Sequence, residues 1–155
     1  MDKDLIMNEA FALAREAAEE GEVPVGAVVT LDGEIVGRGR NRREKSKNAL
    51  AHAEIEAIND ACQNLGGWRL WQCEMFVTLE PCPMCAGAII NSRLKKVTYG
   101  ASDLKAGSCH SVINLFDLPY NHKPEIESGY RADEASALLS DFFKNLRNKK
   151  RATDS

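Results

Sequence analysis

The segment from Glu74 to Gly100 constrains the fold more than any other part of the chain. It begins with a mainly apolar run, Glu74 to Leu79, that is typical of a strand, and it ends with a second such run, Lys95 to Gly100. Pro83 to Asn91 lies between them and is typical of a helix that opens with proline. Strands joined by a helical crossover pair in parallel, because antiparallel neighbours need only a short turn. The sequence therefore predicts an α/β protein with at least one parallel strand pair.

The rest of the chain predicts a helix, two strands and a second helix before this segment, and a loop and a helix after it. The expected elements are an N-terminal helix that ends at Gly21, a hairpin of Val23 to Thr30 and Glu34 to Gly37 with an Asp32-Gly33 turn, a loop from Arg40 to Leu50, a helix from about His52 to Asn64, a loop from Ala101 to Lys123 with one short helix, and a helix from about Asp133 to Asn148. The last helix is expected to place Ala137, Leu138, Phe142 and Leu146 on one side.

The length and composition are those of one globular domain, so we expect a single domain over residues 1–155. Hydrophobic residues make up 44% and charged residues 28%, which argues against disorder over the main body. No apolar run approaches the roughly 20 residues that span a bilayer, and Asp2, Lys3 and Asp4 stand where a signal peptide would be basic and then apolar. We therefore expect a cytoplasmic protein with no membrane partner. In the reducing cytosol, five cysteines favour metal binding or catalysis over disulfides.

Basic residues are concentrated in two segments, although the net charge of the chain is -3. Residues 38–47 hold six bases and one acid, and a basic tail at about 144–155 begins with five bases between Lys144 and Arg151. Two such segments on an acidic protein indicate a polyanionic partner. Solvated surface charge is the alternative explanation for either segment taken alone.

His52, Cys82 and Cys85 form a candidate zinc site. Zinc prefers imidazole nitrogen and thiolate sulfur, and a catalytic site uses three protein ligands so that water can take the fourth position. Both cysteines lie in P-C-P-M-C at 81–85, near the start of the expected helix, where unpaired N–H groups favour the thiolate. A lone C-x-x-C also fits a redox dithiol or half of a four-ligand structural site, so these alternatives stay open. Residues that could complete a structural site are His110, His122 and Cys109.

Glu54 favours a catalytic site over these alternatives. A carboxylate two residues after a metal-binding histidine is poorly explained by a purely structural role, but it supplies the proton carrier that a catalytic metal site needs. Positions 52 and 54 would ordinarily point apart, since each residue of a helix turns the chain by about 100°. At the start of a helix, however, both side chains can line one cavity. The sequence therefore predicts a zinc hydrolase with Glu54 as its acid–base group.

The motifs around these residues resemble those of the zinc-dependent cytidine and adenosine deaminase superfamily. Within it, the chain is most similar to the bacterial tRNA-specific adenosine deaminases, almost end to end. The similar segments are G-E-V-P-V-G-A-V-V at 21–29, G-R-N-R at 39–42, A-H-A-E at 51–54, V-T-L-E-P-C-P-M-C-A-G-A at 77–88, D-L-K-A-G at 103–107 and A-L-L-S-D-F-F at 137–143. The resemblance implies a three-layer α/β/α cytidine-deaminase-like fold, in which helices flank a mixed five-stranded sheet. It also implies a homodimer that deaminates adenosine to inosine at the wobble position of a tRNA anticodon.

The resemblance further implies roles for residues at matching positions. One Zn²⁺ per chain would be bound by His52, Cys82 and Cys85. Glu54 would take a proton from the attacking water and pass it to adenine N1 and the departing amine. The implied substrate contacts are Asn41 to the flipped-out base, Asp103 to the neighbouring nucleotide, and Ala53, Val25 and Lys105.

Asn41 and Asp103 also have a structural explanation, as a turn residue and a helix N-cap, since asparagine and aspartate are favoured at such positions. The sequence departs from many relatives at Arg43, where they have proline, and at Asn48-Ala49-Leu50, where they have Asp-Pro-Thr. These departures fall in the expected loop from Arg40 to Leu50, so the resemblance does not extend to the exact course of this loop or to the local nucleotide preference.

The resemblance makes the anticodon stem-loop of a tRNA the expected partner, with arginine tRNA as the expected species. An anticodon loop suits this chemistry, because a base in a single-stranded loop is the least costly to extrude. A deaminase of a free base or nucleotide, such as guanine, cytidine or deoxycytidylate, is the first rival. It would share the zinc chemistry but would give no task to the basic segments. The second rival is a zinc protein that binds RNA without catalysis, in which Glu54 would be dispensable.

Overall fold

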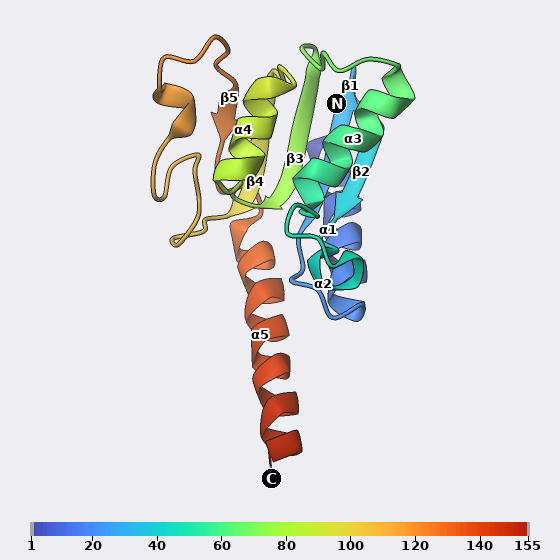
Figure 1. Cartoon of the computed structure of the whole chain (residues 1–155), viewed down its shortest axis with the longest axis vertical. Helices are drawn as coiled ribbons and strands as arrows, with labels where there is room; N and C mark the ends of the chain where they lie inside the picture. The colour runs from blue at the N-terminus through green and yellow to red at the C-terminus, as the bar shows by residue number, and fades with distance from the viewer. Residues whose placement is uncertain (1, 155) are drawn as a thin grey trace.

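A mixed five-stranded sheet forms the middle of the computed structural model, which describes residues 2–154 (Figure 1). The strands are β1 (Gly26–Leu31), β2 (Glu34–Arg40), β3 (Cys73–Leu79), β4 (Lys96–Ala101) and β5 (Glu125–Glu127), in the spatial order β2-β1-β3-β4-β5. β1 pairs antiparallel with β2 and β3, whereas the β3–β4 and β4–β5 pairs are parallel. The predicted parallel pair across the helical crossover is therefore confirmed.

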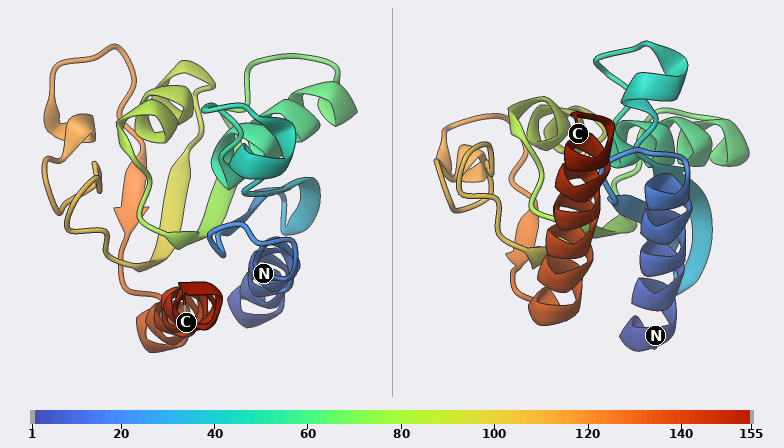
Figure 2. Two further views of the ribbon diagram at one scale, coloured as in Figure 1. Left: turned by 60° about the horizontal axis from the view of Figure 1, so that its bottom comes forward. Right: turned by 90° about the horizontal axis from the view of Figure 1, so that it is seen from below.

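Helices cover both faces of the sheet. They are α1 (Lys3–Glu19), α2 (Arg43–Ser46), α3 (Ala53–Leu65), α4 (Pro83–Asn91) and α5 (Ala132–Asp154), with a short 3₁₀ helix, η1 (Leu115–Asp117). α1 and α5 lie on one face, and α3 and α4 lie on the other (Figure 2). This is the expected three-layer α/β/α fold. Within residues 2–154, none of the helices combines the length and the apolar character needed to cross a membrane.

Side chains of β3 alternate between the two apolar layers of the core. Met75 and Val77 lie in the layer under α3 and α4, and Phe76 lies in the layer under α1 and α5. All three side chains are fully buried. Because helices cover both faces of this strand, its sequence reads as a continuous apolar run.

Local signals form the first helix and the hairpin as predicted. The Asp2 carboxylate caps α1 by accepting hydrogen bonds from the backbone N–H groups of Asp4 and Leu5. Gly21 follows the helix with a φ of 80°. Asp32 and Gly33 join β1 to β2 with φ angles of 52° and 81°, the left-handed pair that a tight hairpin turn requires.

Two glycines of β2 allow α3 to lie directly on the sheet. A Cβ atom on Gly39 would lie 2.2 Å from the carbonyl oxygen of Ala53, and one on Gly37 would lie 2.4 Å from that of Ala57. Neither distance is compatible with a side chain larger than hydrogen. The close approach fixes the height of the first turn of α3 above the sheet, and this turn follows His52.

The structure corrects the prediction that Arg40 to Leu50 is a loop throughout. β2 continues to Arg40, and four residues of the segment form α2. The carboxylate of Glu22, which is only 2% exposed, accepts hydrogen bonds from the backbone N–H groups of Glu44 and Lys45 and so stabilises this helix. Lys47 ends α2 in the left-handed conformation, with a φ of 51°. The stabilising group comes from a distant part of the sequence, so no local pattern indicates the helix.

Two predictions for the C-terminal third were also incomplete or wrong. The elements read from residue patterns had no strand after Gly100, whereas three residues form β5. The last helix continues to Asp154, beyond the predicted end near Asn148. Ala137 is exposed, and Leu146 is 51% exposed, whereas Leu138 and Leu139 pack against the core. The buried side of α5 is therefore rotated from the predicted one and shorter.

Candidate active site

Two helix starts bring the three candidate zinc ligands together. His52 is the N-cap residue of α3, and Cys82 is the N-cap residue of α4, directly after β3 and Glu80-Pro81. Cys85 lies in the first turn of α4 and is buried. The Nδ1 atom of His52 lies 3.6 Å from the Sγ atoms of both cysteines. All three ligand atoms lie within 4.8 Å of one another.

This geometry fits a tetrahedral zinc ion. Zinc binds thiolate sulfur at about 2.3 Å and imidazole nitrogen at about 2.0 Å, which places nitrogen and sulfur about 3.6 Å apart at the tetrahedral angle. The distances from His52 to the two sulfurs match this value. Among residues 2–154, neither His110, His122 nor Cys109 joins the group. The group therefore offers three protein ligands, the number that a catalytic zinc site uses, rather than the four of a structural site.

The setting of Cys82 favours its thiolate form. Hydrogen bonds from Cys85 and His52 lower the pKa of the Cys82 thiol to about 4, against the opposing effect of burial. The hydrogen bond to Cys82, together with burial, raises the pKa of Cys85 above its ordinary value. The Cys82 sulfur is therefore ready to bind a cation, and Cys85 would have to lose its proton for both sulfurs to hold a metal ion.

Glu54 lies beside these ligands in the first turn of α3. Its side chain is only 4% exposed, and burial raises the pKa of the carboxyl to about 7. A carboxyl with this pKa can accept and donate a proton near neutral pH. The expectation that residues 52 and 54 share one cavity is met, because both line the same hollow.

This hollow is a cavity of about 210 Å³ between the start of α3, the start of α4 and two connections. The first of these connections runs from Asn41 to Ala51 and contains α2, and the second is the loop that follows β4 from Ser102 to Asn114. Val25, Asn41 and Asp103 line the cavity together with His52, Cys82 and Glu54. Three of the predicted substrate contacts, Val25, Asn41 and Asp103, therefore lie at the cavity wall.

Asn41 and Asp103 also have the structural roles that their residue types allow. The side-chain oxygen of Asn41 accepts a hydrogen bond of 2.9 Å from the backbone N–H of Ala53, which leaves the Nδ2 donor for a ligand. One carboxylate oxygen of Asp103 accepts hydrogen bonds from the backbone N–H groups of Lys105 and Ala106. The structural and the functional explanations are thus compatible at both positions.

Ala53 and Lys105 are placed differently from the other predicted contacts. Ala53 is fully buried and is not among the residues that line the cavity, but its N–H binds the side chain of Asn41, which does line it. Lys105 is exposed and does not line the cavity. Its backbone N–H is bound to the Asp103 carboxylate.

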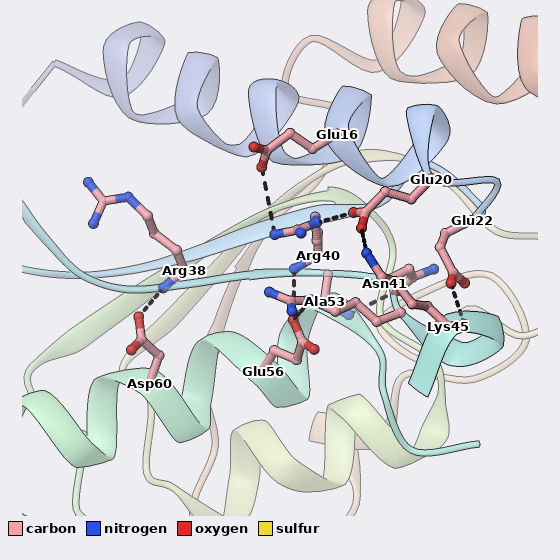
Figure 3. Close-up of polar contacts among 11 residues, drawn as sticks. Glu16, Glu20, Glu22, Arg38, Arg40, Asn41, Lys45, Ala53, Glu56 and Asp60 are labelled. Atoms are coloured by element: carbon pink, nitrogen blue, oxygen red, sulfur yellow. Dashed lines mark hydrogen bonds and ion pairs between the residues drawn. The ribbon is translucent and has the colours of Figure 1, made fainter. Parts of the chain in front are cut away.

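Most of the basic segment 38–47 has acidic partners within the protein (Figure 3). Arg40 lies on β2 and contacts Glu16 of α1 and Glu20, the residue that follows α1. The Nε atom of Arg40 donates to Glu20 at 2.5 Å, and one of its Nη atoms lies 3.7 Å from Glu16. Lys45 also binds Glu20, at 2.8 Å. The remaining ion pairs join Arg38 to Glu9 and Arg42 to Glu56. These contacts hold β2 and α2 against α1 and α3, an explanation that neither sequence alternative contained.

Glu80 is a cavity residue that the sequence interpretation did not single out. It lies between β3 and Cys82, is 2% exposed, and accepts hydrogen bonds from residues of the loop that follows β4. Burial raises its pKa, but the hydrogen bonds from Ser111, Asp103 and His110 outweigh this effect and leave the pKa below its ordinary value. An acid at the end of an apolar strand, directly before the cysteine motif, was the only signal in the sequence.

Sequence comparison places these residues in a known family. The profile of the MafB19-like deaminases matches residues 1–147. The chain belongs to the MafB19-like deaminase family. The tRNA-specific adenosine deaminase of Bacillus subtilis (strain 168) is 47% identical to this deaminase over 150 residues, which cover 96% of this chain and 93% of the relative. The resemblance inferred from the motifs is therefore confirmed.

Solved structures of other deaminases share the fold of this one. A structure from studies of A-to-I editing by tRNA:A34 deaminases at the wobble position of transfer RNA is 42% identical, with a TM-score of 0.85, and the match covers 88% of this chain and 99% of that chain. A guanine deaminase from Bacillus subtilis is 32% identical, with a TM-score of 0.64, and the match covers 96% and 95%. The expected fold class and the expectation of a deaminase are both confirmed.

Proposed function

We propose that this deaminase converts adenosine to inosine at the wobble position of a tRNA anticodon, with one zinc ion per chain. The observation that carries the proposal is the Glu54 carboxyl, buried in the same cavity as His52 and Cys82. A metal site alone would support only a metal protein. A buried carboxyl beside it supplies the proton carrier that hydrolytic deamination needs.

The residues of the cavity divide the chemistry between them. His52, Cys82 and Cys85 would hold the zinc ion, which supplies Lewis-acid activation of water when it is bound. Glu54 accepts one proton from the attacking water and delivers it to N1 of adenine. It then accepts the remaining proton from the new C6 hydroxyl group and passes it to the amine, which departs as the C6–N6 bond breaks. A pKa of about 7 suits both directions of transfer at neutral pH. Ammonia leaves, and inosine remains.

The walls of the cavity would select and orient the base. The free Nδ2 donor of Asn41 hydrogen-bonds the extruded base, and Ala53 keeps this amide in its orientation. Val25 provides an apolar surface for the purine ring. Asp103 contacts the neighbouring nucleotide from the other loop. Lys105, exposed on that loop, contacts a backbone phosphate rather than the base.

Phosphate binding would fall to the basic residues that have no acidic partner. Arg43 opens α2 and lines the cavity, and neither Arg43 nor Lys47 has an ion pair within residues 2–154. The exposed C-terminal part of α5 carries further bases at the end of a helix that projects beyond the sheet (Figure 1). Removal of the chain after Leu146 should weaken tRNA binding and reduce its salt dependence. Unchanged affinity and salt dependence would assign the tail to solvated surface.

Three further features of the proposal concern partners and place. The protein would act as a homodimer on an arginine tRNA in the cytoplasm. The tRNA substrate of its relatives supports the cytoplasmic assignment. Light scattering after gel filtration measures the dimer, and a monomeric mass at micromolar concentration would contradict it. A panel of tRNAs with adenosine at the wobble position measures the species preference.

The first experiment is a deaminase assay with three substrates in parallel, read as inosine in tRNA, xanthine from guanine and uridine from cytidine. The substrates are an arginine tRNA with adenosine at the wobble position, free guanine and free cytidine. The similarity to a guanine deaminase makes free guanine the most important comparison. Activity on the tRNA alone supports the proposal, and activity only on the free compounds would overturn it.

A Glu54→Gln variant serves as the matched control for catalysis. It should lose turnover while zinc content stays near one per chain, because the substitution keeps the size of the side chain and removes only its acid–base function. Unchanged turnover would refute the role of Glu54. It would also reopen the alternative of a zinc protein that binds RNA without catalysis.

A further inference from the structure

The loop from Ser102 to Asn114 has no helix or strand, yet it forms one wall of the cavity. A loop without regular structure depends on other contacts to fix its backbone. Several of its backbone N–H groups converge on one side chain, the carboxylate of Glu80.

The two oxygens of Glu80 accept five hydrogen bonds from this loop. Oε1 accepts from the backbone N–H of Asp103 at 3.0 Å and from the hydroxyl of Ser111 at 2.5 Å. Oε2 accepts from the backbone N–H groups of Cys109, His110 and Ser111 at 3.2, 2.9 and 2.9 Å. The carboxylate therefore binds the loop at two places. The first is Asp103, which lines the cavity, and the second is the run of residues 109–111.

No lysine or arginine of residues 2–154 forms an ion pair with Glu80. A buried carboxylate without a cation needs hydrogen-bond donors to replace its lost hydration, and the N–H groups of the loop supply them. The carboxylate and the loop conformation are thus mutually dependent. Gly107 shows how closely the loop encloses this group, because a Cβ atom there would lie 2.3 Å from the Glu80 Cδ atom.

The anchor at Asp103 leads directly to the cavity. With its N–H bound to Glu80, and with one carboxylate oxygen bound to the N–H groups of Lys105 and Ala106, the Asp103 side chain has one oxygen left for a ligand. Its position at the cavity wall is set by these contacts. Glu80 itself is too enclosed by donors to take part in proton transfer.

We propose that Glu80 is a positioning residue that holds the loop of residues 102–114 so that Asp103 meets the nucleotide next to the reacting adenosine. This inference rests on the proposed function. It assigns Glu80 a task in substrate binding, separate from zinc binding and from the proton transfers of Glu54. Loss of the anchor should therefore affect the KM for an anticodon stem-loop much more than kcat.

The test is a Glu80→Gln variant. An amide of the same shape keeps one oxygen for the three N–H groups of residues 109–111 and turns its NH₂ group toward the N–H of Asp103, so the bond to Asp103 is the one that is lost. We expect KM to rise about tenfold, the effect of losing one charge-assisted hydrogen bond, with kcat changed less than about twofold and zinc content unchanged. Ser111→Ala is the matched control, because it removes a donor to the same carboxylate and leaves Asp103 bound.

A double-mutant cycle shows whether Glu80 acts through Asp103. On an Asp103→Ala background, the Glu80→Gln substitution should raise KM by less than about twofold further, because the contact it positions is already absent. An equal rise on both backgrounds would overturn the inference. If Glu80→Gln fails to fold, Gly107→Ala pushes the loop from the carboxylate without removing a charge, and it should raise KM in the same way.

Amide hydrogen exchange separates this inference from the proposed function. Exchange at Asp103 should accelerate at least tenfold in Glu80→Gln, relative to wild type and to Ser111→Ala, whatever the substrate proves to be. Unchanged exchange, or faster exchange with an unchanged KM, would refute the positioning role. Failure of the wild-type protein to form inosine in tRNA would instead refute the proposed function.

Discussion

Replacing Gly39 with alanine should disable the metal site without touching any of its residues. The new Cβ atom would lie 2.2 Å from the carbonyl oxygen of Ala53 and 2.6 Å from the backbone nitrogen of Ala57. Ordinary contact begins at 3.4 Å, so the first turn of α3 must move away from β2 by about 1.2 Å. His52 directly precedes this turn, and Glu54 lies within it.

A movement of this size exceeds the tolerance of a zinc site, where metal–ligand distances vary by only about 0.2 Å. It also displaces the Glu54 carboxyl, and a misplacement of about 1 Å can lower a rate roughly 100-fold. We therefore expect Gly39→Ala to bind zinc more weakly and to lose about 100-fold in kcat. Zinc content after dialysis and inosine formation in an anticodon stem-loop measure the two effects.

Gly87→Ala is the control for this experiment. Gly87 lies on α4, the helix that carries Cys85, and a Cβ atom there meets nothing within 4 Å. Alanine should stabilise the helix by roughly 0.5–1 kcal/mol and leave zinc content and kcat unchanged. If Gly39→Ala keeps full zinc occupancy and full kcat while circular dichroism shows a folded protein, the close approach of α3 to β2 does not determine the site.

Three further predictions concern acid stability, the metal and the second loop. Hydrogen bonds from Arg40 and Lys45 lower the pKa of Glu20 to about 2, so the stability that Glu20 contributes is present above the ordinary pKa of 4.5 and is lost as pH falls toward 2. The Tm difference between wild type and Glu20→Gln should therefore shrink between pH 4.5 and 2. A constant difference would contradict the assignment. Dialysis against a chelator should abolish inosine formation and lower the Tm, and one equivalent of zinc should restore both, since a ligand that binds the native state stabilises it. Glu22→Gln should lower the free energy of unfolding, measured in urea, by roughly 1–2 kcal/mol and speed amide exchange in α2, because the buried Glu22 carboxylate binds two N–H groups of this helix. Unchanged exchange rates would show that α2 has another source of stability.

The sequence by itself determined the elements that depend on local patterns. The apolar runs on either side of Pro83 to Asn91 specified a parallel strand pair, and Asp32-Gly33 specified the hairpin, because burial and turn geometry act over a few neighbouring residues. The candidate ligands could also be named, since zinc selects histidine and cysteine, and a helix start is the place where both thiolates are favoured. The close packing of His52, Cys82 and Cys85 agrees with this prediction.

Only the tertiary structure decided how these parts depend on one another. The bases of segment 38–47 looked like a surface for a polyanion, but Arg40 and Lys45 pair with Glu20, a partner distant in sequence. As a single acid in the sequence, Glu80 carries no mark of a role. Its role follows from the loop of residues 102–114, which folds back over it and donates hydrogen bonds to it. A charge in a sequence carries no mark of its partner, because the energy of a contact depends on distance and burial, which only the folded chain defines.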